Sequence, residues 1–145
     1  MSKYIHKIDD IIKTLNSAAS FYQDAKSQVK DPSIATLFEK MRMIKQQAVT
    51  RLTPFVIIQE GEPEEGNNYS VEARKIYANL LAKLSSDTDH TLVAQLEEVE
   101  DKTLSDITQA MDNEQPPEVY STLREIYVDM KACHDEIHAV ERATA

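Results

Sequence analysis

The sequence is poor in glycine, proline and aromatic residues. Two glycines and five prolines occur in 145 residues, whereas globular proteins use about 7% glycine and about 5% proline. So few glycines leave little room for tight turns, strand bulges or glycine-rich phosphate-binding loops. Tryptophan is absent and aromatic residues make up 6% of the chain, so the core must be mainly aliphatic, which suits packed helices. These absences predict an all-α protein.

Cysteine and long apolar segments are equally scarce. The single Cys133 excludes an intramolecular disulfide and is expected to be a small core residue in a reducing compartment, the cytoplasm. The opening residues MSKYIHKIDD contain no apolar signal-peptide core, so we do not expect secretion. The longest uninterrupted apolar run, Phe55 to Ile58, is far shorter than a membrane span. We therefore expect no membrane association.

Positive charge is in deficit. The chain has 25 Asp and Glu against 16 Lys and Arg, which gives a formal net charge of −9. Such a charge repels nucleic-acid phosphates and anionic lipid headgroups, to which basic proteins bind by releasing counterions. Neither nucleic acid nor a membrane surface is expected as a partner.

Apolar residues recur in steps of three and four along most of the chain, which predicts amphipathic helices. A chain of 145 residues is the size of one domain. We therefore predict one domain, residues 1–145, with helices at about 3–29, 32–59, 71–84, 89–111 and 117–142. The pattern is clearest in the last helix, whose seam consists of Val119, Leu123, Ile126, Met130, Cys133, Ile137 and Val140.

Turn signals arrange the long helices in two antiparallel hairpins. Asp31 can cap the second helix while Pro32 takes its first position, which needs no N–H group. The segment Gly61 to Asn68 holds both glycines and is the clearest loop in the chain. The short helix at 71–84 is then the crossover between the two hairpins. This is the plan of a ferritin-like, up-down four-helix bundle.

Two features of this plan involve the end of the second helix. Pro54 removes a backbone hydrogen bond and clashes with the carbonyl of Thr50, so we expect a kink or an early stop, at a cost of about 3 kcal/mol unless packing compensates. Phe55 to Ile58 are apolar on every side of a helix, and Ile11 and Ile12 likewise extend an apolar surface to a second face. A crossing segment or a dimer partner would cover these residues.

Several phrases of the sequence are similar to a known family in their order and spacing. They are LNSAASFYQDAKSQVKDPSIATLFEKM at Leu15 to Met41, GEPEE at Gly61 to Glu65, LEEVED at Leu96 to Asp101 and PPEVYSTLREIYVDMKACHDEIH at Pro116 to His138. Together they run along nearly the whole chain and resemble the short bacterial ferritin-like four-helix-bundle proteins whose domain has no known function. The resemblance implies a ferritin-like fold and a bacterial cytoplasmic protein linked to stress responses. It implies no particular reaction.

A di-iron site in such a bundle requires a Glu from each of two helices and a Glu-x-x-His motif from each of the other two. Most of these ligands are missing. The middle of the first helix has residues such as Ser17 and Gln23 where the resemblance suggests glutamates, and residues 41–49 include neither an acid nor a histidine. In the last helix Asp129 lies five residues before His134, which is not the required spacing.

A reduced metal site remains conceivable from the sequence. Glu97 and Glu100 lie one turn apart on the fourth helix and face a helix that carries Asp129 and His134. Two carboxylates and an imidazole could hold one divalent ion, with water in the remaining positions. The alternative is a solvated acidic face with His134 hydrogen-bonded to one of its acids. His134 and His138 are also spaced to bind zinc or nickel on a helix surface, but the sequence specifies no third ligand.

No complete catalytic motif occurs, and the seam position of Cys133 should raise the pKa of its thiol by burial. We therefore interpret the protein as a non-enzymatic bundle without a cofactor. It would act by self-association, as a homo-oligomer such as a dimer, or by binding a protein partner. The alternative hypothesis is a storage or redox protein that holds iron, manganese or zinc through the four residues Glu97, Glu100, Asp129 and His134.

Overall fold

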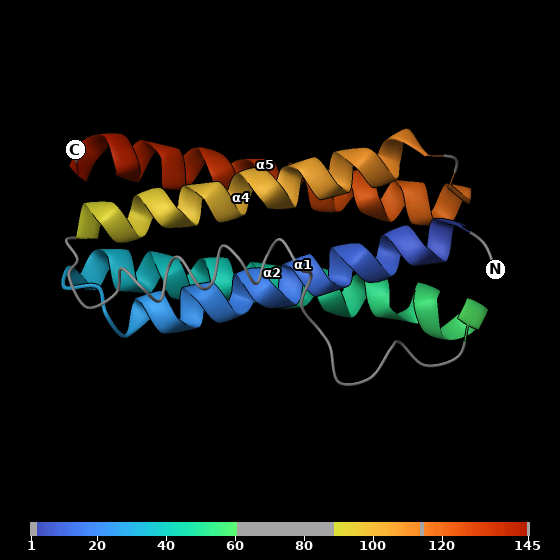
Figure 1. Cartoon of the computed structure of the whole chain (residues 1–145), viewed down its shortest axis with the longest axis horizontal. Helices are drawn as coiled ribbons and strands as arrows, with labels where there is room; N and C mark the ends of the chain where they lie inside the picture. Colours follow the sequence, from blue (N-terminus) through green and yellow to red (C-terminus); the bar gives the residue numbers. More distant parts are fainter. Residues whose placement is uncertain (1–2, 61–88, 114, 145) are drawn as a thin grey trace.

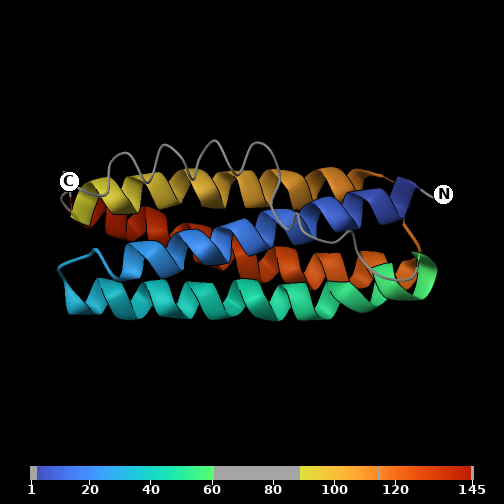
Figure 2. The same ribbon diagram turned by 60° about the horizontal axis from the view of Figure 1, so that its bottom comes forward.

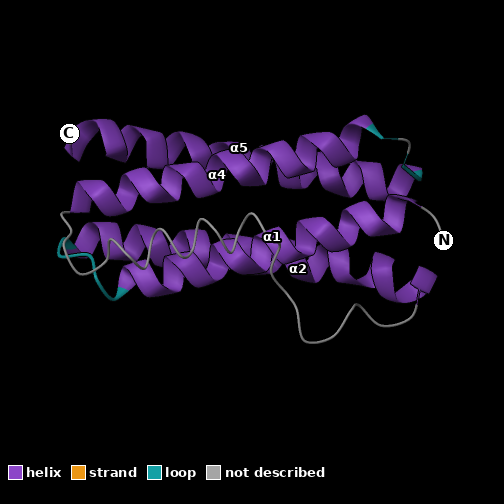
Figure 3. Ribbon diagram, in the orientation of Figure 1, coloured by secondary structure: helices purple, strands orange, loops and turns teal. Residues whose placement is uncertain are grey.

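The computed structural model describes residues 3–60, 89–113 and 115–144, which form long helices and the turns between them (Figures 1 and 3). The all-α prediction is confirmed for these residues. The ends of the second, fourth and fifth predicted helices fall within two residues of the observed ones, whereas the first is shorter than predicted. The predicted crossover helix at 71–84 lies outside the described residues. The observed helices are α1 (Lys3–Lys26), α2 (Pro32–Glu60), α4 (Asp89–Asp112) and α5 (Pro117–Thr144).

The four helices pack as two antiparallel hairpins, as predicted (Figure 2). α1 pairs with α2, and α4 pairs with α5. Each hairpin also contacts the other, because α1 packs on α4 and α2 packs on α5. α2 and α4 are therefore diagonally opposite across the bundle, and α2 and α5 are the least closely packed neighbours. None of these four helices is long and apolar enough to cross a membrane.

The turn between α1 and α2 explains why α1 ends early. The amides of Gln28 and Val29 both donate to the carbonyl of Ala25, at 3.0 Å, and this turn closes the helix before residue 29. Asp31 then caps α2 as predicted, because its carboxylate accepts a hydrogen bond from the Ser33 amide at 2.8 Å. The chain thus reverses within a few residues.

The same turn is attached to the second hairpin. The carboxylate of Asp89, at the first position of α4, accepts the amides of Lys30 and Asp31, each at 2.9 Å. These two amides belong to the short turn and have no place in the helical hydrogen-bond ladder, so Asp89 satisfies donors that would otherwise depend on water. The start of α4 is therefore held against the α1–α2 turn.

Pro54 does not end α2, which continues to Glu60. Of the two outcomes expected at Pro54, a kink or an early stop, the early stop does not occur, and α2 ends one residue after its predicted bound at residue 59. Leu52 and Val56, on either side of the proline, are 0% and 2% exposed. Their burial compensates for the lost hydrogen bond, which otherwise costs about 3 kcal/mol.

The apolar residues for which a second cover was expected are largely covered within the chain. Ile11, Ile12 and Val56 are buried, and Phe55 is half-buried against the same cluster. The side chains of residues 57 and 58 lie outside the described part of the structure. These positions therefore give no reason of their own to invoke a second chain.

Apolar side chains fill the bundle in two clusters, one toward each end. The predicted seam of α5 is confirmed, since all its members are buried except Val140, which is half-buried. Between the clusters lies a charged layer, because α2 places Lys45 between Met41 and Ala48, and α4 places Glu100 next to Val99. The first cluster contains Tyr22, Phe38, Met41, Leu96, Val99, Cys133 and Ile137, and the second contains Leu15, Ala48, Leu52, Ile107, Leu123, Ile126 and Met130.

Charge is divided unequally between the hairpins. α1 and α2 together carry eight Lys and Arg against five Asp and Glu. α4 and α5 carry four Lys and Arg against thirteen Asp and Glu. The acidity of the chain is thus concentrated on the second hairpin, and the two hairpins attract each other.

Candidate functional site

The centre of the bundle holds an ion pair between diagonally opposite helices. Lys45 of α2 and Glu100 of α4 are both 0% exposed, and the Lys45 ammonium donates to the two carboxylate oxygens of Glu100 at 2.9 and 2.8 Å. Tyr22 of α1 donates its hydroxyl to the same carboxylate. The Lys45 Nζ also lies 5.4 Å from the centroid of the Tyr22 ring, a cation–π distance. Three helices therefore meet through one polar network.

Both oxygens of the buried Glu100 carboxylate have hydrogen-bond partners. Glu100 accepts three hydrogen bonds, and the Tyr22 ring packs edge-on against Phe38 with 5.6 Å between centroids. Burial, followed by the negative charge of Glu100, raises the pKa of Tyr22 well above its usual value. The Tyr22 hydroxyl therefore stays protonated and continues to donate.

Cys133 of α5 lies in the apolar cluster next to this network and is buried, as predicted. Burial raises the pKa of the Cys133 thiol to about 11, and the carboxylates of Glu100 and Glu136 act in the same direction, whereas Lys45 opposes them. At neutral pH the residue is a thiol. Since the thiolate is the reactive form, burial keeps Cys133 in its less reactive form.

The four residues predicted to hold a metal ion are placed in different environments. The Glu100 carboxylate is bonded to Lys45 and Tyr22 inside the bundle. Glu97 contacts His138 on the surface, and Asp129 lines a hollow between α2 and α5. The structure therefore does not bring Glu97, Glu100, Asp129 and His134 together around one point.

His134 follows the alternative interpretation. Its Nε2 lies 2.8 Å from Oδ1 of Asp101, and its Nδ1 lies 3.2 Å from Oδ1 of Asp135. Asp101 belongs to the acidic stretch of α4 for which a solvated face was predicted. His134 is thus hydrogen-bonded to Asp101 of that face, whereas Glu100, which the same interpretation placed on the solvated face, is buried.

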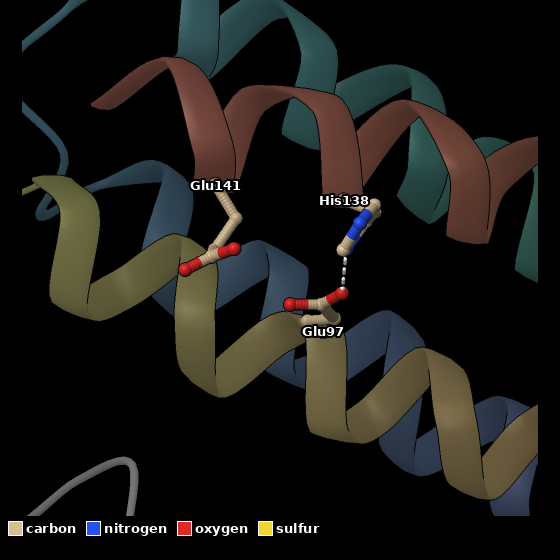
Figure 4. Close-up of side chains that lie close together, drawn as sticks. All are labelled: Glu97, His138 and Glu141. Atoms are coloured by element: carbon tan, nitrogen blue, oxygen red, sulfur yellow. Dashed lines mark hydrogen bonds and ion pairs between the residues drawn. The ribbon is translucent and has the colours of Figure 1, made fainter. Parts of the chain in front are cut away.

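Histidines and carboxylates alternate along the surface where α4 and α5 lie side by side. His138 contacts Glu97 across the two helices, and Glu141 follows one turn later (Figure 4). Nε2 of His90 lies 3.7 Å from Oε2 of Glu141. The rings of His134 and His138 are stacked, with centroids 6.2 Å apart and planes at 4°. This row faces solvent, in contrast to the buried ion pair.

Two residues of these sites were not predicted from the sequence. Lys45 was not predicted as a core residue because lysine is almost never fully buried unless it is paired, although it stands four residues after Met41 and three before Ala48, at a seam position. Glu141 was overlooked although it follows His138 by three residues and so shares its helix face. In both cases the three- and four-residue spacing indicates the helix face on which the residue lies.

The sequence was compared with known proteins. No curated protein matches it. Residues 3–113 match the model of a family described as "Domain of unknown function (DUF2383)". The matched range includes α1, α2 and α4 and ends before α5, so the phrase Pro116 to His138, which contributed to the resemblance noted above, lies outside it. Since the match covers well over half of the residues, the chain belongs to this DUF2383 family.

Proposed function

We propose that this protein is a non-enzymatic, ferritin-like bundle that acts through its surface by forming a homodimer. The ferritin-like assignment is supported by the two packed hairpins and by the sequence phrases described above. The non-enzymatic assignment is supported by the interior, where Lys45, Glu100 and Tyr22 satisfy one another and Cys133 is a protonated thiol. These groups stabilise the bundle and are not available to a substrate.

The proposed dimer interface is the side of the bundle formed by α2 and α5. These helices pack least closely, and a hollow of about 240 Å³ lies between them. Gln47 lines both this hollow and a groove of about 460 Å³ on α2, so the two lie next to each other. Met43, which is 48% exposed, lies in the groove. The surface is thus concave and partly apolar.

The charges on this side suit a second copy of the chain. α2 contributes Lys40 and Arg51, and α5 contributes Glu136 and Glu125, which they contact within one chain. These four side chains remain 39% to 62% exposed, so they can also contact another molecule. In a two-fold dimer the same surface meets itself, and α2 of each copy can face α5 of the other. This self-complementary pattern, basic α2 beside acidic α5, is the observation that carries the proposal.

A concentration series measured by size-exclusion chromatography with light scattering tests the proposal. The wild-type chain is expected to dimerise. Arg51→Glu and Glu125→Arg each place like charges across the interface and are expected to weaken the dimer about tenfold, since two exposed contacts per dimer are worth about 1 kcal/mol together before repulsion is added. An equimolar mixture of the two variants should recover dimers, because opposite charges face each other again in the heterodimer.

Lys102→Glu serves as the matched control. It makes the same charge change as Arg51→Glu, but on α4, where Lys102 pairs with Asp106 next to α1. Dimerisation of this variant should equal that of the wild type. A wild-type chain that stays monomeric at every concentration contradicts the proposal, and so does a mixture that dimerises no better than its components.

A further inference from the structure

Three potential metal ligands converge where α4 and α5 run side by side, at a site separate from the ion pair and from the proposed dimer interface. Glu97 comes from α4, and His138 and Glu141 come from α5 (Figure 4). One ligand atom of each residue lies within 4.8 Å of the other two. Since His138 and Glu141 are three residues apart on one helix, they share a face. Two rigid helices therefore hold the three ligands.

The kinds of ligand indicate the kind of ion. One imidazole nitrogen with two carboxylate oxygens suits Zn²⁺ and neighbouring first-row ions, whereas Ca²⁺ and Mg²⁺ are normally bound by oxygen alone. Three protein ligands leave one position of a tetrahedral ion for water or for a further side chain. The thirteen acidic residues of α4 and α5, against four basic ones, add a field that attracts cations.

We infer that Glu97, His138 and Glu141 form a surface site for one divalent transition-metal ion of the Zn²⁺ type. The contact between His138 Nδ1 and Glu97 Oε2 is a hydrogen bond whose hydrogen the ion replaces.

His90 of α4 borders this site next to Glu141. Its Nε2 lies 3.7 Å from Glu141 Oε2. The Thr144 hydroxyl donates to the Val140 carbonyl at 2.9 Å, and its oxygen lies 3.0 Å from Nδ1 of His90, within hydrogen-bond distance. A hydrogen bond on the other ring nitrogen is the usual support of a metal-binding histidine.

An ion at this site connects α4 and α5 far from the turn that joins them. The turn follows Asp112, whereas Glu97 lies in the first half of α4 and Glu141 near the end of α5. The covalent chain thus holds one end of the hairpin, and the ion holds the other. Binding should therefore stabilise the second hairpin specifically.

Calorimetric titration of the metal-free, full-length chain with Zn²⁺ tests the inference. One equivalent should bind to the wild type. His138→Ala and Glu141→Gln each remove one ligand and should weaken binding at least about tenfold, the equivalent of about 1.4 kcal/mol. Circular dichroism should show unchanged helicity in both variants, because the replaced side chains are on the surface.

His134→Ala is the matched control, since it removes the imidazole stacked next to His138 but none of the three ligands. Its affinity for Zn²⁺ should equal that of the wild type. The inference is overturned if the wild type does not bind Zn²⁺, or if His134→Ala loses affinity while His138→Ala retains it. The latter result would favour a site that includes His134, as the sequence alone suggested.

Discussion

Replacing Lys45 by methionine tests the account of the interior most directly. Methionine fills a volume similar to that of the lysine side chain without its charge, so packing changes little. Glu100, however, loses the two hydrogen bonds from the ammonium and keeps only that from Tyr22. A fully buried carboxylate then lacks its counter-ion.

The expected loss is large on the scale of a small protein. Removing one partner of a buried ion pair costs about 3 to 5 kcal/mol, because the other charge stays buried without compensation. Total stabilities of small proteins are about 5 to 15 kcal/mol. Lys45→Met should therefore remove a substantial part of the free energy of unfolding.

Urea denaturation followed by circular dichroism at 222 nm, a wavelength sensitive to helix in general, measures this loss. The triple variant Lys45→Met/Glu100→Leu/Tyr22→Phe removes every polar member of the network, and it should recover most of the stability, since an apolar replacement of a buried pair is often neutral or stabilising by about 1 to 4 kcal/mol. The contrast between the single and triple variants isolates the unpaired charge from the change of volume.

Two results would refute the reasoning. A single Lys45→Met variant that loses less than about 1 kcal/mol would mean that Glu100 does not depend on the ammonium. A triple variant as unstable as the single one would attribute the loss to packing instead of charge.

Two further predictions concern titrating groups. Hydrogen bonds from Arg42 and Lys26, at 2.5 and 2.8 Å, lower the pKa of Glu39 from 4.5 to about 2. Because the pKa of Glu39 is lower in the folded state, its contribution to the free energy of unfolding is complete above pH 4.5 and disappears as the pH falls through about 2. The stability difference between wild type and Glu39→Gln, measured by urea denaturation at several pH values, should therefore vanish over that range. A difference that grew as the pH fell would contradict the assignment. Cys133, with its pKa raised to about 11 by burial, should react with a thiol reagent near pH 8 only as fast as the bundle opens; labelling as fast as that of a free thiol would contradict its burial.

Periodicity was sufficient to predict most of the fold. Steps of three and four placed the seam of α5, and Asp31 with Pro32 located the start of α2, because both signals are local. The same local signals left open whether Pro54 would kink or end α2, although the predicted bound at residue 59 lies one residue from the observed end. Whether Pro54 interrupts a helix depends on how firmly Leu52 and Val56 are packed by other helices, and the sequence around the proline does not contain that information.

The candidate sites were predictable only in part, for a related reason. Glu97, Glu100 and His134 were predicted as candidate metal ligands, but their observed partners include residues at distant positions. Glu100 pairs with Lys45, which is 55 residues away, and Glu97 pairs with His138, which is 41 residues away. The partner of each residue depends on how each helix is oriented about its own axis. Packing between helices sets this orientation, and the sequence of one helix does not give it.

The diagonal position of Lys45 and Glu100 has a consequence for how the two hairpins can be aligned. Sliding one hairpin past the other by a single helical turn, about 5.4 Å, would largely preserve an aliphatic interior, because one Leu or Ile can replace another. It would also push both charges into opposite apolar clusters. We expect the ion pair to reject such shifted assemblies, so that the chain adopts one alignment where the aliphatic residues alone would allow several.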